Sequence, residues 1–127
     1  ERLAQATAFR SRWYQEGRRL HEHYDALALP SAQVFPFDVN LTWPREIAGR
    51  AMDTYHRWMQ VVIPGTMSGC PVANIPAGFD ERGLSMGMQL IVPMHREIEA
   101  LEFAIAHDEA MPWPSRRLPP VLGAQDA

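Results

Sequence analysis

The side chains that could act as nucleophiles in this sequence have no candidate general base near them in the chain. The one cysteine, Cys70, follows Ser68 and Gly69 and precedes Pro71. A thiol or hydroxyl nucleophile needs a general base beside it, and no spacing ties any of the five histidines to Cys70. We therefore expect an inert, buried thiol, and an enzyme that depends on Cys70 is the least favoured alternative. Ser85 also lacks a base nearby in the sequence.

The basic residues of the chain are all arginines. The lysine-plus-arginine total is 12, and no lysine contributes to it. Schiff-base chemistry, P-loop phosphate binding and Ser–Lys catalysis therefore cannot come from this chain alone. Codon bias in a GC-rich genome is the favoured origin of the pattern, and the exclusion holds whatever the origin.

Two short polar runs and two strand amides are the remaining candidates for chemistry. His21 and His23 are two residues apart on an expected helix, where side chains at that spacing diverge, so we predict no metal site. The run 107–109 is interpreted as a solvated helix face, and no cofactor is predicted.

Asn74 and Gln89 lie within apolar strands. An unpaired buried amide costs about 1–3 kcal/mol, so each needs a partner. Protein groups are favoured over a ligand in that role.

The composition bounds the class of protein. The 127 residues are 46% hydrophobic and 21% charged, with a formal net charge of −3, which suits one domain with a hydrophobic core. No apolar run reaches the roughly 18 residues of a membrane span, and no secretion signal is visible. The acidic balance disfavours a nucleic-acid partner. A single cysteine favours a reducing compartment, and we expect a cytoplasmic protein.

Hydrophobic periodicity predicts helices and strands in the order of an α/β fold. The expected helices span 1–24, 44–63 and 96–111; the expected strands span 25–30, 71–79 and 84–92; a tail covers 112–127. Strands 71–79 and 84–92 should pair through a short polar loop in which Gly83 takes a positive φ. The second helix should begin near Pro44, with Thr42 as its cap, and end at Pro64–Gly65.

Apolar stripes indicate which helix faces should be buried. The first helix carries Leu3, Phe9 and Trp13 on one stripe, and no capping residue precedes it. A helix already periodic at its first turn suggests that the chain was cut from something longer. The last helix should point the following residues inward: Ile98, Leu101, Ala104 and Ile105.

Two neighbouring segments carry a family resemblance. Residues 66–79 read TMSGCPVANIPAGF and residues 83–93 read GLSMGMQLIVP. They resemble the small-residue turn, Gly-x-Pro, Pro-x-Gly-Phe and following Gly-Leu-Pro-x-Gly-x-Gln-Leu-Ile strand of the amidase signature family. Residues 25–32, DALALPSA, resemble that family's Asp-x-Leu-x-x-Pro-Thr stretch. Ser85 departs from the usual proline, and Cys70 from the usual aliphatic residue.

The resemblance implies an α/β/α sandwich, of which this chain would supply helices packed on a small mixed or antiparallel sheet. Residues 1–127 would form a single C-terminal segment of the amidase domain. The turn formed by Met67, Ser68, Gly69 and Cys70 would approach the substrate pocket. Family members hydrolyse carboxamides to acid and ammonia, or deliver ammonia to a transamidation partner, with a Ser–Ser–Lys triad. No position here matches a triad residue, so the resemblance implies no catalytic residue in this chain and inactivity of the chain alone.

Partners follow from the same resemblance. The missing N-terminal part of the amidase fold would be the main partner, and a small amide the substrate of the whole enzyme. Exposed sheet edges and apolar surface would drive self-association of the isolated chain. The alternative hypothesis is an independent, non-catalytic α/β binding module of the same ancestry, which should be a monomer with covered sheet faces.

Overall fold

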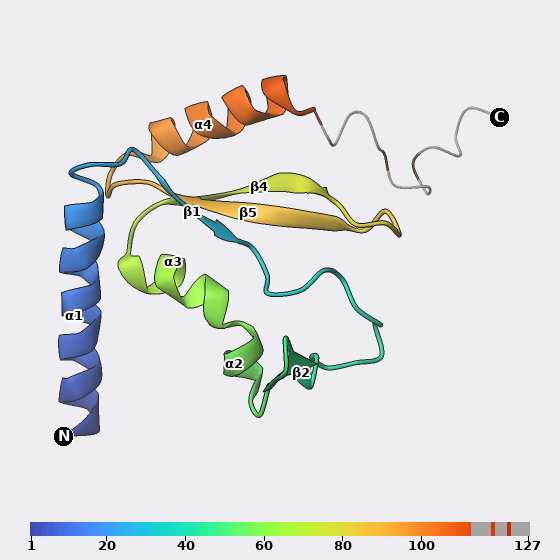
Figure 1. The fold of residues 1–127 in the computed structure, drawn as a ribbon. Coiled ribbons are helices and arrows are strands. Elements are labelled where there is room, and N and C mark those ends of the chain that lie inside the picture. The colour runs from blue at the N-terminus through green and yellow to red at the C-terminus, as the bar shows by residue number, and fades with distance from the viewer. Residues whose placement is uncertain (113–117, 119–121, 123–127) are drawn as a thin grey trace.

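The computed structural model describes residues 1–112, 118 and 122. Its sheet has three strands in the order β1-β5-β4, which are Leu27–Pro30, Ser85–Ile91 and Val72–Phe79, and both pairings are antiparallel. Helix α4 (Glu97–Ala110) lies along one side of the sheet, and α3 (Ile63–Ser68) lies on the other with α1 (Arg2–Leu20) beside it (Figure 1). The predicted α/β class, with helices on a small antiparallel sheet, is confirmed.

The β4–β5 hairpin forms where the sequence predicts it. Gly83 closes the turn with φ +82°, a conformation that glycine adopts without steric cost. Its N–H donates to the carbonyl of Asp80 at 2.9 Å, and the N–H of Asp80 donates to the carbonyl of Leu84 at 2.9 Å. The ladder then runs from Phe79↔Ser85 to Val72↔Ile91, with a bulge between Pro76 and Gly78. The predicted pairing and the positive φ of Gly83 are both confirmed.

The Asp80 carboxylate stabilises this turn, and its contribution depends on pH. It accepts hydrogen bonds from the backbone N–H of Leu84 at 2.8 Å and from Nε of Arg82 at 2.9 Å. Burial raises the pKa of Asp80, but these hydrogen bonds lower it more, so the net pKa lies below the ordinary value of 3.8. A depressed carboxyl pKa stabilises the fold above the unfolded-state pKa and loses that effect as pH falls through the folded-state pKa.

We expect Asp80→Asn to lower the urea midpoint at pH 6 and to differ less from the parent chain as pH drops below 3.8. The midpoint should be measured from pH 6 to pH 2 for both chains. Glu81→Gln is the matched control, because Glu81 is exposed in the same turn. A difference between the parent chain and Asp80→Asn that stays constant across this range would contradict the assigned role.

Strand β5 divides its side chains between the two faces of the sheet. Gln89 and Ile91 face α3, since a Cβ built on Gly65 of that helix would lie 3.1 Å from Oε1 of Gln89 and 3.5 Å from Cδ1 of Ile91. Met88 and Leu90 point to the opposite face. The buried apolar residues of the described chain are few: Met52, Ile75, Ile91, Val92 and Ala100. The hydrophobic core is therefore thin.

The predicted helix over 44–63 is wrong. Its first part is a small hairpin, β2 (Glu46–Ile47) and β3 (Arg50–Ala51). Ala48 and Gly49 form the loop with φ +49° and +76°, the pair of positive values that a type I′ turn requires. Helical structure begins only at α2 (Tyr55–Trp58) and continues through the 3₁₀ turn η1 (Gln60–Val62).

The helix boundaries near this hairpin also differ from the prediction. Thr54, not Thr42, caps α2, and its hydroxyl accepts a hydrogen bond from the N–H of Arg57. Pro64 does not end a helix but occupies the first turn of α3, where proline is tolerated because its missing N–H needs no partner. The helical spacing of apolar residues was therefore misleading over the first half of this segment.

Helix α1 ends at Leu20, four residues before the predicted end at residue 24, and its apolar stripe is largely uncovered. Leu3 is 81% exposed and Phe9 is 67% exposed. Tertiary contact is concentrated on α3, where Nε1 of Trp13 donates to the carbonyl of Pro64 at 3.0 Å. The N-terminal half of α1 extends away from the sheet (Figure 1).

The prediction that the large apolar residues of the last helix point inward is wrong. Ile98, Leu101 and Ile105 are 73%, 62% and 59% exposed. The buried residue of α4 is Ala100, and Ala104 is half-buried. The helix itself, Glu97–Ala110, lies within the predicted 96–111.

Most of the tail predicted over 112–127 lies outside the described residues. Among the residues that are described, no helix has the length and apolar character needed to cross a membrane.

Candidate functional site

The turn to which the family resemblance pointed is the C-terminal end of α3. Ser68 is buried, and its hydroxyl donates to the carbonyl of Gly65 at 2.7 Å. The same oxygen accepts the backbone N–H of Cys70 at 3.1 Å. The first bond lies within α3 and the second ties the end of that helix to the segment before β4, so the Ser68 hydroxyl has a structural role in this arrangement. Cys70 is half-buried rather than fully buried.

Gly69 terminates α3 in the left-handed conformation, with φ +73°. Glycine is the usual residue there because it has no Cβ to clash. A Cβ at this position would meet Cε of Met94 at 3.6 Å, an ordinary contact, so the positive φ is the constraint. Met67 stays 42% exposed, and its carbonyl accepts Nε of Arg10 at 3.4 Å.

A polar cavity of about 310 Å³ opens where this turn meets α1. Met67, Ser68 and Gly69 line it, whereas Cys70 does not. The remaining lining comes from α1 and the segment before α4: Thr7, Arg10, Ser11, Tyr14, Gln15 and Met94. Sequence reasoning missed the α1 side, because the contact joins residues as far apart as Arg10 and Met67 and no local signal marks it.

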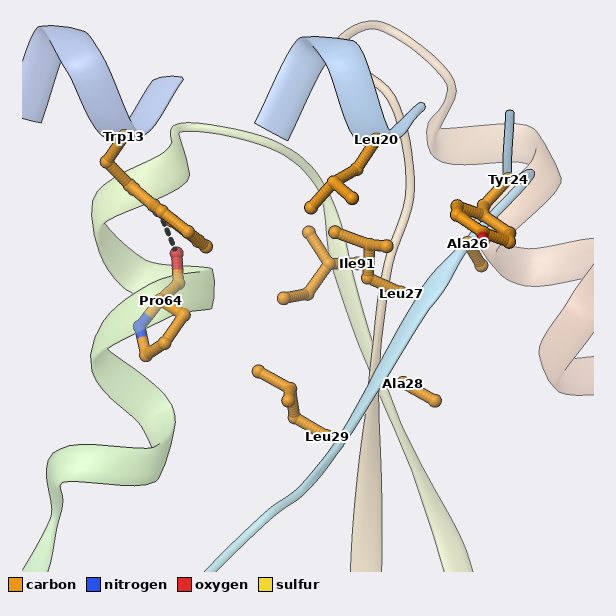
Figure 2. Close-up of a pocket in the computed structure, with 9 residues that line it drawn as sticks. All are labelled: Trp13, Leu20, Tyr24, Ala26, Leu27, Ala28, Leu29, Pro64 and Ile91. Atoms are coloured by element: carbon orange, nitrogen blue, oxygen red, sulfur yellow. Dashed lines mark hydrogen bonds between the residues drawn. The ribbon is translucent and has the colours of Figure 1, made fainter. Parts of the chain in front are cut away.

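An apolar cavity of about 380 Å³ lies between α1, β1 and α3. Figure 2 shows Leu20 and Ile91 pointing toward one another, with Leu27 and Leu29 of β1 on the same side of the strand. Ala28 points away from this space. Trp13 and Pro64, which share a hydrogen bond, also line this cavity.

A second apolar cavity, of about 440 Å³, adjoins it along α1. We call it the α1–α3 groove, and its lining residues are Ala6, Phe9, Arg10, Trp13, Ile63, Pro64 and Met67. Arg10 is its one charged lining residue, and Arg10 also lines the polar cavity. The groove and the polar cavity share Arg10 and Met67 in their lining.

The two amides predicted to need partners have them within the protein. Nε2 of Gln89 donates to the carbonyl of Pro30 at 2.7 Å and to that of Val61 at 3.4 Å. Ser31 donates its hydroxyl to Oδ1 of Asn74. For Gln89, which is buried, the expectation that protein groups act as partners is confirmed, and its side chain joins β5 to β1 and η1. Asn74 is exposed, so the premise that it is a buried amide is wrong.

The histidines do not form a catalytic or metal-binding cluster with other described side chains. His21 lies at the end of α1, and its Nδ1 contacts the carbonyl of Tyr24 at 3.3 Å. Within residues 1–112, 118 and 122, no three histidine, cysteine, aspartate or glutamate side chains are placed to hold a metal ion.

The family model, the curated relatives and the solved structures that resemble this chain all point to amidases and related proteins. The family model described as Amidase matches residues 1–101. Among curated relatives, a glutamyl-tRNA(Gln) amidotransferase subunit from Gloeothece citriformis (strain PCC 7424) is 30% identical over 105 residues, covering 83% of this chain and 20% of the relative. The corresponding protein of Cyanothece sp. (strain PCC 7425 / ATCC 29141) is 29% identical over 102 residues, covering 80% and 20%. The chain thus spans about a fifth of the length of these relatives.

Solved structures share the fold. A bacterial aryl acylamidase belonging to the amidase signature enzymes aligns with a TM-score of 0.77 at 23% identity, over 88% of this chain and 23% of that one. A second chain comes from a vestigial protein complex that reveals the origins of an s-triazine catabolic enzyme. It aligns with a TM-score of 0.75 at 22% identity, over 85% of this chain and 24% of that one.

Proposed function

This chain belongs to the amidase family, and we propose that it is the C-terminal segment of an enzyme that hydrolyses a small carboxamide to an acid and ammonia. The observation that carries the proposal is the family match over residues 1–101. The shared fold of the amidase signature neighbours supports it. The charge of −3 supports a small amide rather than a nucleic acid as the substrate class. We also propose a cytoplasmic location.

The role proposed for this segment is to support the substrate pocket rather than to perform the chemistry. A Ser–Ser–Lys mechanism needs a lysine base, and the chain has none. The hydroxyl of Ser68 is already hydrogen-bonded to Gly65 and Cys70. We propose that the turn from Met67 to Cys70 borders the pocket of the complete enzyme, with Met67 as its exposed apolar side chain.

We expect the isolated chain to be inactive. It should release no ammonia from aliphatic or aromatic carboxamides, and a fluorophosphonate probe should leave its serines unlabelled, because no general base activates them. The longer polypeptide, encoded with a lysine and a Gly/Ser-rich stretch, should release ammonia and be labelled. Labelling of Ser68 or Ser85 in the isolated chain would overturn the proposal for this segment.

The alternative of an independent binding module predicts a different behaviour. Such a module would keep its apolar surfaces covered and sediment as a monomer at all concentrations. The exposed large apolar side chains of α1 and α4, among them Leu3, Phe9, Ile98 and Leu101, favour the segment proposal instead.

A further inference from the structure

The N-terminal half of α1 lacks the packing that normally sustains a helix in water. Helices shorter than about 12–15 residues are marginal by themselves, and most helix stability in proteins comes from packing of an apolar face. Here Leu3 and Phe9 are mostly exposed, whereas Trp13 of the same helix is half-buried and donates a hydrogen bond to the carbonyl of Pro64 in α3. Phe9 lines the α1–α3 groove, whereas Leu3 does not and stands at the exposed N-terminal end of the same helix.

Arg10 is the charged residue of the α1–α3 groove, and it has no acidic partner among the described residues. Its hydrogen bond goes to the carbonyl of Met67. The lining of the α1–α3 groove and of the polar cavity includes no aspartate or glutamate. A guanidinium group at the border of an apolar groove pairs best with a carboxylate, which it can bind through two parallel hydrogen bonds.

We propose that the α1–α3 groove receives an apolar segment with an acidic side chain from the part of the amidase polypeptide that lies outside these 127 residues. The length comparison supports this occupant, since about four-fifths of each curated relative lies outside the match. The acidic side chain pairs with Arg10, and apolar side chains cover Phe9 and Leu3. The inference rests on the proposed function only in taking the chain to be part of a longer amidase.

Limited proteolysis with thermolysin tests the proposal, because this protease cuts before large apolar residues such as Leu3 and Phe9. In the isolated chain, cleavage at these two positions should be fast. In the longer polypeptide encoded through the same reading frame, it should be at least about tenfold slower, since cleavage requires local opening of a packed segment. Cleavage is followed by intact mass over time.

Two substitutions identify the surface responsible for the protection. Arg10→Glu in the longer polypeptide should restore at least about tenfold faster cleavage at Leu3, because it places a carboxylate opposite the acidic side chain. Phe9→Ser should do the same by removing the apolar contact. The matched controls are Arg18→Glu, which alters an exposed arginine of the same helix, and Ile105→Ser, which alters a comparably exposed residue of α4. Both controls should keep cleavage within about twofold of the parent.

Each other result overturns the proposal. Protection that already exists in the isolated chain and grows with its concentration assigns the groove to a second copy. Equal cleavage rates in the isolated chain and the longer polypeptide, or the absence of a longer reading frame, leave the groove without the proposed occupant. Amide hydrolysis is scored separately, so a protected but inactive polypeptide counts against the proposed function and not against this surface.

Discussion

Replacing Gln89 by methionine is expected to lower the free energy of unfolding by about 1–3 kcal/mol, the cost of leaving buried polar groups unsatisfied. Methionine has a similar length, so the cavity term is small. The amide of Gln89 is buried and donates to the carbonyls of Pro30 and Val61. Both carbonyls lose this donor in the variant. Urea unfolding followed by far-UV circular dichroism measures the difference.

Gln5→Met is the matched control for this prediction. Gln5 lies on α1 with an exposed side chain, so the same chemical change should shift stability by less than about 0.5 kcal/mol. The loss at Gln89 should also appear as faster amide exchange in β1, because Pro30 is held to β5 partly by this side chain. An unchanged urea midpoint in Gln89→Met would show that the two hydrogen bonds contribute nothing net.

Gly87→Ala is expected to destabilise the chain by about 1–3 kcal/mol, the usual range where an added group forces its neighbours to shift. The added Cβ would lie 2.6 Å from Oγ of Ser31 and 3.0 Å from Oδ1 of Asn74. Ser31 also donates its backbone N–H to the carbonyl of Gly87 at 2.9 Å. The end of β1 therefore cannot move away from β5 without breaking that bond.

Two further variants separate crowding from a general effect of replacing glycine. Ser31→Ala removes the closest atom, so the double variant with Gly87→Ala should recover part of the loss, and the coupling should be measured by a double-mutant cycle. Gly17→Ala is the matched control, because nothing lies within 4 Å of its added Cβ. In the helix it should raise stability by roughly 0.5–1 kcal/mol. Additive effects at positions 31 and 87 would contradict the clash.

The hairpin and the last helix were predictable because their signals are local. Gly83 supplies the positive φ within a short loop, and the alternation from Leu84 onward gives one consistent face to β5. The bounds of α4 follow from the same kind of local periodicity. Such elements can be placed without knowing what packs on them, and the family resemblance rests on this same region.

The same reasoning wrongly predicted one helix over residues 44–63, and the cause is physical. Its apolar spacing suits a helix, yet Ala48 and Gly49 both adopt positive φ and turn the chain back on itself. The hairpin is held from outside its strands: Nε1 of Trp43 donates to the carbonyl of Met52 at 3.0 Å, and Arg45 lies 4.2 Å from the ring of Trp43. A residue with a Cβ rarely takes the conformation of Ala48, so the sequence contains no strong signal for this turn.

Only part of the cavity lining could be named from the sequence. The resemblance pointed to Met67, Ser68, Gly69 and Cys70, of which the first three line a cavity and Cys70 does not. That this turn borders a substrate pocket stays a prediction. The wall contributed by α1 depends on long-range packing, which no periodicity reveals. The apolar stripes of α1 and α4 likewise predicted the two helices correctly, but most of the large side chains on those stripes are exposed rather than buried.

The strand order β1-β5-β4 has a consequence for synthesis on the ribosome. Pro30 precedes Gln89, the side chain that holds it, by 59 residues. At about 5–20 residues per second, β1 emerges roughly 3–12 s before its partner strand exists. During that interval Leu27 and Leu29 have no β5 to pair with. The β4–β5 hairpin, closed by a short loop, should form first, and β1 should then pair with β5 at the edge of this hairpin.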